Sequence, residues 1–220
     1  MDPEQVVSAL LEHVLKPGTA IEGRRDWPDA VVFHTARFGF LARSAEWRLA
    51  GAPWVDTAVR VVADGYVENC AITYGFVFER GGRVLYLNDR ATMRDLGRRV
   101  GDDLEPLAYA ELVAELYSGS QIDGPTVIPF AATEAHPAGA LIWDVDEFLA
   151  EYPFVAAALV WTPTVHSAQK QTTVEFCSYH YYITETVGAL DILKWTIVGG
   201  HGNEVAWSRR YVAQRLERPA

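Results

Sequence analysis

The chain has 220 residues, of which 50% are hydrophobic and 22% charged, as is typical of a globular protein with a sizeable core. Its formal net charge of −10 at pH 7 argues against nucleic acid as a partner, because phosphate binding needs a basic surface. No apolar run approaches the roughly 20 residues of a membrane span, and the N-terminus shows no secretory signal, so we expect a cytoplasmic protein that binds no membrane.

The first part of the chain contains one clear helix and one ambiguous stretch. Residues 3–15 are predicted to form a helix, because Asp2 suits the N-cap, Pro3 suits the first helical position and apolar residues recur with helical spacing. Residues 31–50 fit two interpretations, one long helix or two short strands. Gly39 weakens the helical alternative, since glycine costs about 1 kcal/mol in a helix interior.

A strand over residues 57–62 is followed by a predicted hairpin. The two strands of the hairpin, residues 66–79 and 83–87, flank Gly81 and Gly82, and a pair of glycines is typical of a two-residue hairpin turn. This turn gives the opposite pairs Phe78 with Leu85 and Phe76 with Leu87. The register places the aromatic residues of the first strand on one apolar face.

Three more helices and a short strand are predicted in the middle of the chain. The helices cover residues 92–99 and 106–117 and the stretch that begins after Asp144, which suits an N-cap. Residues 140–143 form the short strand. Residues 119–139 are rich in Gly, Pro, Ala and Thr, and we interpret them as a long loop within one domain, with a weak domain boundary as the alternative.

The C-terminal stretch, residues 171–215, contains three strand-like runs rich in aromatic and β-branched residues. Loops over residues 184–189 and 199–203 separate them and predict the register of two successive hairpins. The predicted opposite pairs are Ile183 with Leu190, His180 with Leu193, Tyr182 with Asp191, Val198 with Glu204, Trp195 with Trp207, Leu193 with Arg209, and Asp191 with Tyr211.

Both hairpins place one set of side chains on a common face of the predicted meander. Its polar and aromatic end contains His180, Tyr182, Asp191, Arg209 and Tyr211. Its apolar end includes Trp195 and Trp207. A hydrophobic floor beside a few directed polar groups is typical of a small-molecule pocket. The structural alternative is an Asp191–Arg209 ion pair next to a histidine that faces solvent at a sheet edge.

The predicted pocket suggests a division of roles. His180 would transfer a proton, Asp191 would orient it and raise its pKa, and Arg209 with Tyr182 would hold an oxyanion. The substrate-binding residues would be Tyr182, Tyr211, Trp195, Trp207 and Glu68. Glu68 lies on the apolar face of its predicted strand, where burial would raise the pKa of its carboxyl group. The structural alternative is that Glu68 lies at the exposed end of its strand.

Other reactive residues have simpler structural explanations. The carboxylates of residues 144–147 could attract a divalent cation, but acidic residues at a helix start are typical of capping, so we expect no metal site. Cys177 is predicted to point away from His180, which favours a buried thiol over a nucleophile. Cys70 and Cys177 form no C-x-x-C pair, and we expect neither a disulfide nor a metal from them.

The order of elements predicts an α+β fold, a single domain over residues 1–220 with a curved, mostly antiparallel sheet packed against helices and a three-stranded C-terminal meander. This layout is similar to the cone-shaped folds of the nuclear-transport-factor-like and polyketide-cyclase type, where helices close one end of a curved sheet. The resemblance is one of architecture, and no residue roles follow from it.

Two functional hypotheses follow, since the sequence contains no metalloprotease, nucleophile-elbow or dinucleotide-binding motif. The first is an enzyme without an organic cofactor, a cyclase, isomerase or dehydratase that acts on a small apolar or aromatic molecule. The alternative is an acidic binding protein, such as an immunity-type protein that neutralises a basic partner. Its contact residues would be Glu175, Asp102, Asp103 and residues 144–147. The oligomeric state, including a homodimer, stays open.

Overall fold

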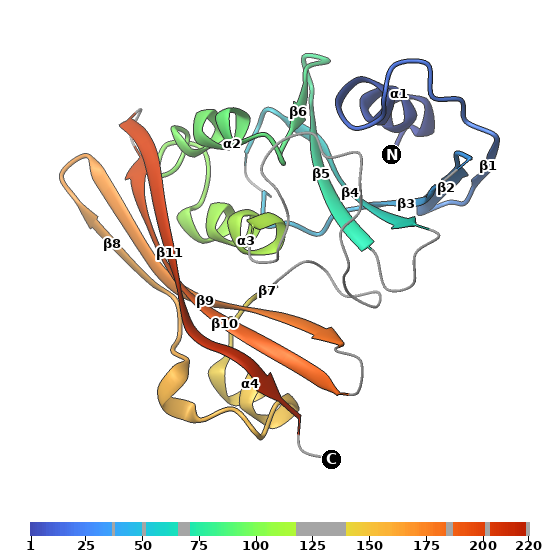
Figure 1. Ribbon diagram of the computed structural model, residues 1–220. Helices are drawn as coiled ribbons and strands as arrows, with labels where there is room; N and C mark the ends of the chain where they lie inside the picture. Colours follow the sequence, from blue (N-terminus) through green and yellow to red (C-terminus); the bar gives the residue numbers. More distant parts are fainter. Residues whose placement is uncertain are drawn as a thin grey trace.

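The computed structural model describes residues 1–36, 38–49, 52–65, 71–117, 140–183, 187–200 and 203–218. For residues 64–65, 71–72, 182–183 and 203 it describes the backbone alone. Within these ranges the chain has four α-helices and 11 strands in two antiparallel sheets, which confirms the α+β prediction (Figure 1). The helices are α1 (Pro3–His13), α2 (Arg90–Gly97), α3 (Pro106–Tyr117) and α4 (Val145–Glu151), with a 3-10 turn at Ala157–Leu159.

The first sheet is a six-stranded antiparallel sheet in simple chain order. It contains β1 (Gly23–Asp26), β2 (Ala30–His34), β3 (Phe38–Ser44), β4 (Val55–Gly65), β5 (Ala71–Glu79) and β6 (Val84–Tyr86). Residues 31–50 therefore contain two strands rather than a helix. The α1 helix is confirmed: Asp2 accepts a hydrogen bond from the Glu4 amide at 3.0 Å, and the apolar side of the helix packs on this sheet.

The second sheet confirms the C-terminal meander. It contains β7 (Ala140–Leu141), β8 (Thr164–Ala168), β9 (Gln171–Ile183), β10 (Gly188–Gly200) and β11 (Asn203–Glu217). Strands β9, β10 and β11 follow one another, while β7 and β8 pair with the outer edge of β9. The predicted strands thus divide between two sheets. The single-domain prediction stays a prediction, and the loop predicted at 119–139 lies outside the described residues.

The largest apolar core lies between the two sheets, with α3 at its centre (Figure 1). Tyr109 and Leu112 of α3 are fully buried there, together with Val77 from the first sheet and Trp195 from the second. A third core lies on the opposite side of the second sheet, where α4 covers it. The middle of the second sheet, at β10, is therefore buried on both of its faces.

The hairpin of β5 and β6 has a different register from the predicted one. Phe78 pairs with Val84 and Phe76 with Tyr86, so the predicted partners Leu85 and Leu87 were wrong by one residue. The cause is the turn: the Glu79 amide donates to the Arg83 carbonyl at 2.8 Å, which leaves three residues in the loop. Only the second glycine, Gly82, has a positive φ, of 83°, as in a three-residue loop with a left-handed glycine.

The helix α2 packs closely on β11, and Gly97 makes this approach possible. A Cβ atom at Gly97 would lie 2.6 Å from Val205 Cγ2 and 2.8 Å from the Tyr109 hydroxyl. We therefore expect Gly97→Ala to lower the free energy of unfolding by about 2 kcal/mol, because overpacking outweighs the better helix propensity of alanine. Urea denaturation would measure the loss. Gly81→Ala is the control, since a Cβ there has no neighbour within 4 Å, and equal effects of both changes would contradict the prediction.

No helix within the described ranges has the length and apolar character needed to cross a membrane.

Candidate functional site

The predicted site lies on β9, β10 and β11, but both hairpins have registers shifted by two residues from those predicted. The observed pairs are His180 with Asp191, Ser178 with Leu193, Phe176 with Trp195, Ala189 with Tyr182, Leu193 with Tyr211, Trp195 with Arg209, and Ile197 with Trp207. A shift of two residues keeps every side chain on its predicted face, because side chains alternate along a strand. The prediction that these side chains share one face is therefore correct, but the predicted pairs of opposite residues on that face were wrong.

Glycines that look like loop residues explain both shifts. Gly188 continues β10 and pairs with Ile183, and the Tyr181 ring lies where a side chain at Gly188 would project. Gly199 also belongs to β10, and Val205 fills the space beside it. The loops between the strands are therefore shorter than the sequence suggested.

His180 and Asp191 form the centre of the observed arrangement. They lie directly opposite each other on β9 and β10, which puts their Cβ atoms about 5 Å apart. The backbone amide of Arg215 on β11 donates to Asp191 Oδ1 at 2.8 Å. Arg215 has a φ of 50° and lies where the pairing of β10 with β11 becomes irregular. This irregularity turns a backbone donor toward the carboxylate and fixes its position.

Burial determines the protonation state of His180. Desolvation lowers the pKa of His180 below its ordinary value of 6.5, and Asp191 opposes this effect without overcoming it. The sequence-based expectation of a raised pKa was therefore wrong, although the effect of Asp191 has the expected sign. His180 is neutral at pH 7 and is able to accept a proton.

Arg209 does not lie where the prediction placed it. It is opposite Trp195, two residues farther from Asp191 than expected, and its guanidinium lies 5.6 Å from the centre of the Trp195 ring. The same guanidinium donates to the main-chain carbonyl of Tyr117, the last residue of α3. Arg209 thus connects β11 with α3, and the register gives no support to an ion pair with Asp191.

The remaining predicted residues have three different environments. Trp195 is fully buried, stacks on Phe176 and donates from Nε1 to Ser178 Oγ at 2.8 Å, so we assign it to the core. Tyr211 is 48% exposed and accessible to a ligand. The side chain of Tyr182 and all of Glu68 lie outside the described residues.

Trp207 belongs to a group of residues that the sequence did not bring together. Its half-buried ring lies 5.7 Å from the Tyr117 ring, and the guanidinium carbons of Arg90 and Arg94 on α2 lie 5.8 and 5.9 Å from its centre. We call Trp207, Tyr117, Arg90, Arg94 and Arg209 the arginine–tryptophan cluster. The only signal in the sequence was the four-residue spacing of Arg90 and Arg94, which puts both on one side of a helix.

The other reactive residues have structural roles. Asp144 Oδ1 accepts from the amides of Asp146 and Glu147, which is the capping role expected. Cys177 is free and buried in the core beneath α4, and burial raises the pKa of its thiol to about 11. Glu175 pairs with Lys194 at 2.9 Å. Within the described ranges, no three His, Cys, Asp or Glu side chains are grouped to hold a metal ion.

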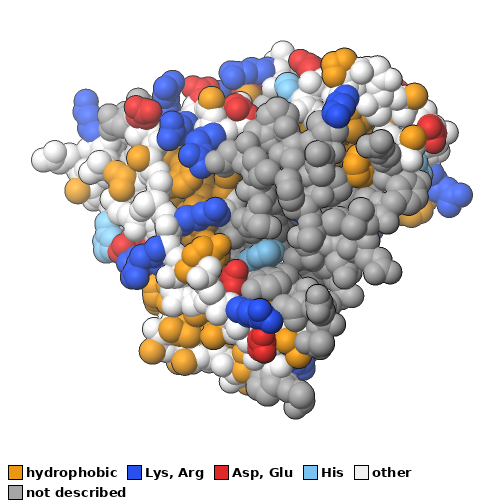
Figure 2. Space-filling view, viewed as in Figure 1, with side chains coloured by type: hydrophobic (Ala, Val, Ile, Leu, Met, Phe, Trp, Pro, Cys, Tyr) orange, Lys and Arg blue, Asp and Glu red, His pale blue; other side chains and the backbone are white. Residues whose placement is uncertain are grey.

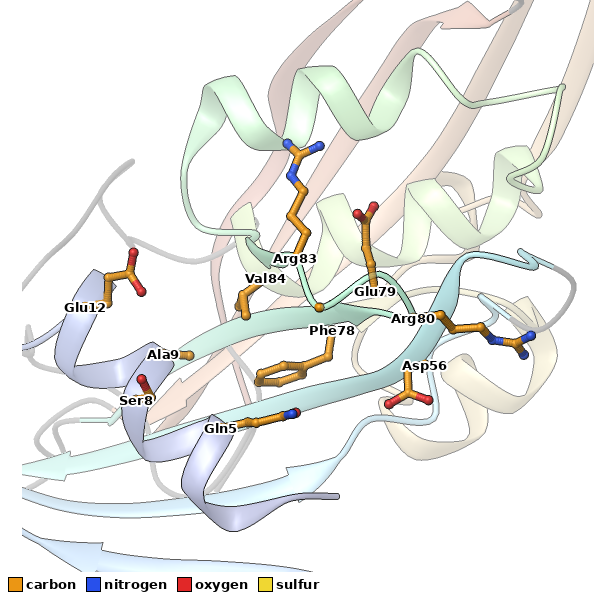
Figure 3. A pocket seen from close by; sticks show the side chains of 11 residues that line it. Gln5, Ser8, Ala9, Glu12, Asp56, Phe78, Glu79, Arg80, Arg83 and Val84 are labelled. Carbon is orange, nitrogen blue, oxygen red and sulfur yellow. The ribbon is translucent and has the colours of Figure 1, made fainter.

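Two cavities of about 330 Å³ are lined by described residues, and neither includes a residue of the predicted site. One lies beside the loop between α2 and α3, near Arg48. The other lies between α1 and the hairpin of β5 and β6 (Figure 3). Figure 3 shows the ring of Phe78 between the strands and α1, with Arg80 and Arg83 directed away from it. This size is at the lower end of the range for ligand pockets.

Comparisons of the chain with models of protein families, with curated proteins and with solved structures found no match.

Proposed function

We propose that the protein is an acid–base enzyme without an organic cofactor that acts on a small, largely apolar or aromatic molecule. The observation that carries this proposal is the His180–Asp191 pair, a half-buried imidazole beside a carboxylate that a main-chain amide holds in place. Proton abstraction next to a carbonyl group is the step that cyclases, isomerases and dehydratases share, and a neutral imidazole suits it at pH 7.

The two residues have complementary roles in this mechanism. His180 accepts the proton from the substrate carbon and returns it to the product, so no net proton is consumed. Asp191 stabilises the imidazolium that forms in between, because a fixed opposite charge favours the protonated ring. The exposed Tyr211 lies near this pair in the sheet, on the strand next to Asp191, and supplies a hydroxyl for the substrate oxygen.

Hydrogen–deuterium exchange tests the proposed proton transfer. Aromatic and polyketide-like carbonyl compounds are first screened by thermal shift against the parent protein and His180→Ala. Compounds that stabilise only the parent are incubated in D₂O, and deuterium incorporation beside the carbonyl is followed by NMR. We expect His180→Gln to slow the exchange by about 100-fold or more.

His166→Gln is the matched control, since it makes the same change at an exposed histidine of β8. Exchange that is equally fast in His180→Gln would remove His180 as the base. A parent protein that exchanges no compound but binds a basic protein partner would support the alternative hypothesis of an interaction protein.

The pH dependence follows from the lowered pKa of His180. The exchange rate should increase as the pH rises through the pKa of His180 in the folded protein, which lies below 6.5. Above that pKa the rate should be constant. The unfolded chain takes up this proton at a higher pH than the folded one, so stability falls as the pH drops below 6.5. In an NMR titration, Asp191→Asn should lower the His180 midpoint further. A midpoint above 6.5 in the parent would contradict the proposal.

A further inference from the structure

The cavity between α1 and the hairpin of β5 and β6, which we call the α1 cavity, has a volume of about 330 Å³ and an apolar floor (Figure 3). Phe78 of β5 and Ala9 of α1 form part of this floor and are 5% and 2% exposed. The exposed residues Gln5, Ser8 and Glu12 form the helical wall, since residues three and four positions apart share one side of a helix. The α1 cavity therefore combines an apolar floor with a polar rim.

A β-bulge brings a carboxylate to one end of the α1 cavity. The pairing of β4 with β5 skips Asp56, which lies between the paired residues Val55 and Thr57. A bulge of this kind bends its strand and redirects the side chain of the extra residue. Asp56 lines the cavity, and Figure 3 shows the Gln5 side chain extending toward it from α1.

The carboxylates of Glu12 and Asp56 lie at opposite ends of the α1 cavity. Figure 3 shows Phe78 and Ala9 between them. Asp56 lies beside Gln5, and a helix rises about 1.5 Å per residue, so the step from Gln5 to Glu12 spans about 10 Å. The two carboxylates are therefore too far apart to bind one metal ion, whose oxygen ligands lie within about 2.6 Å of it.

Neither of these two carboxylates has a hydrogen-bond or ion-pair partner in the part of the chain that the structure describes. The other charged side chains nearby are engaged elsewhere: Arg83 lies 3.8 Å from Asp95, and Glu79 lies 3.1 Å from Arg99. The Nε of Arg80 donates to a main-chain carbonyl of β4 at 3.2 Å. Figure 3 shows both Arg80 and Arg83 directed away from the cavity, so the two carboxylates lack a fixed countercharge.

The surface around α1 favours a positively charged ligand. The helix contains Glu4 and Glu12 but no Lys or Arg. In Figure 2 the Lys and Arg side chains gather over α2 and the C-terminal strands, whereas acidic side chains border α1 at the upper right. The formal charge of the whole chain is −10, so its field attracts cations to this face.

We propose that the α1 cavity binds a linear diamine. One ammonium group binds Glu12 and the other binds Asp56, and the hydrocarbon chain between them lies on the Phe78 ring. An ammonium group has three N–H donors, and the Gln5 amide oxygen and the Ser8 hydroxyl are acceptors along the same rim. This proposal does not depend on proton transfer at His180.

Calorimetric titration with cadaverine, a five-carbon diamine, tests the site at constant ionic strength. We expect saturable binding with a Kd below about 10 mM. Pentylamine, which has the same carbon chain and one ammonium group, should bind about fivefold more weakly. Ethylenediamine should bind no better than pentylamine, because its two nitrogens are too close together to reach both carboxylates.

Two variants each remove one of the carboxylates. Glu12→Gln and Asp56→Asn should each weaken cadaverine binding about fivefold. The same variants should change pentylamine binding by no more than about twofold, because a monoamine still has the other carboxylate available. Each variant therefore removes the advantage of the diamine over the monoamine.

Matched controls lie outside the α1 cavity. Glu4→Gln makes the same change as Glu12→Gln on the same helix, and Asp29→Asn removes an exposed carboxylate between β1 and β2. Both should bind cadaverine like the parent. Ser8→Phe keeps both carboxylates and fills the space between them, so it should weaken cadaverine binding severalfold.

Cadaverine should also raise the melting temperature of the parent more than that of Glu12→Gln or Asp56→Asn, which are folded because both changes are at exposed side chains. Four results would overturn the proposal. They are the absence of saturable binding, equal affinities for pentylamine and cadaverine, an equal loss of affinity in the control variants, and displacement of cadaverine by the same concentration of Mg²⁺.

Discussion

Trp195→Ala should lower the free energy of unfolding by about 4 kcal/mol, which is a large part of the stability of an ordinary domain. Trp195 is fully buried, and its ring stacks on Phe176 with 5.8 Å between the centroids. Alanine would leave a large cavity between α3 and the second sheet, and Ser178 Oγ would lose the indole donor 2.8 Å away. Urea denaturation followed by circular dichroism would measure the change.

Trp207→Ala is the comparison for this prediction. Trp207 lies on the same face of the second sheet, opposite Ile197, but it is only half-buried and borders the core. Its removal should cost about 1–2 kcal/mol, because much of its surface stays in contact with water. If the two variants lost similar stability, the assignment of Trp195 to the central core would be wrong.

Glu115→Ala should lower the free energy of unfolding by about 3 kcal/mol. Glu115 is a buried carboxylate of α3, and its Oε2 accepts from the indole nitrogen of Trp47 at 2.6 Å. Its Oε1 lies 2.9 Å from Arg60 Nε on β4, where the contact lacks hydrogen-bond geometry and acts as a charge pair. Alanine would leave the buried Trp47 N–H without its acceptor and a cavity beside it.

Glu115→Gln separates the hydrogen bond from the charge. The amide oxygen still accepts from Trp47, so this variant should lie within about 1 kcal/mol of the parent. Burial raises the pKa of the Glu115 carboxyl group, while Arg60 and Trp47 oppose the shift. The folded protein therefore binds this proton more tightly than the unfolded chain does, and the parent should lose stability relative to Glu115→Gln as the pH rises above 4.5. A difference that does not depend on pH would contradict this explanation.

The sequence predicted the side of the sheet on which each side chain lies better than it predicted which residues pair between neighbouring strands. Alternation of apolar and polar residues is visible in a single strand, and it correctly put His180, Asp191 and Arg209 on one side of the meander. Register depends on loop length, and glycine is ambiguous in this respect. Gly188 and Gly199 were interpreted as loop residues, whereas side chains of Tyr181 and Val205 cover them within the sheet.

The candidate sites depend on contacts that have no local signal. Arg215 adopts a left-handed φ of 50°, which nothing about an arginine predicts, and its amide holds Asp191. Arg209 binds a main-chain carbonyl of α3, a group that every residue possesses. The arginines of α2 reach Trp207 only through the packing of α2 on β11. Such contacts follow from tertiary structure and not from spacing.

The burial of β10 on both faces of the second sheet affects how the chain avoids misfolded states. Ile192 and Leu193 are adjacent in β10, and both are fully buried, one in the core beneath α4 and the other in the core around α3. A strand that slipped by two residues would keep every side chain on its correct face, so alternation alone does not penalise it. In this protein such a slip would disturb two cores at once, and the energy gap between the native pairing and its nearest competitor is accordingly widened.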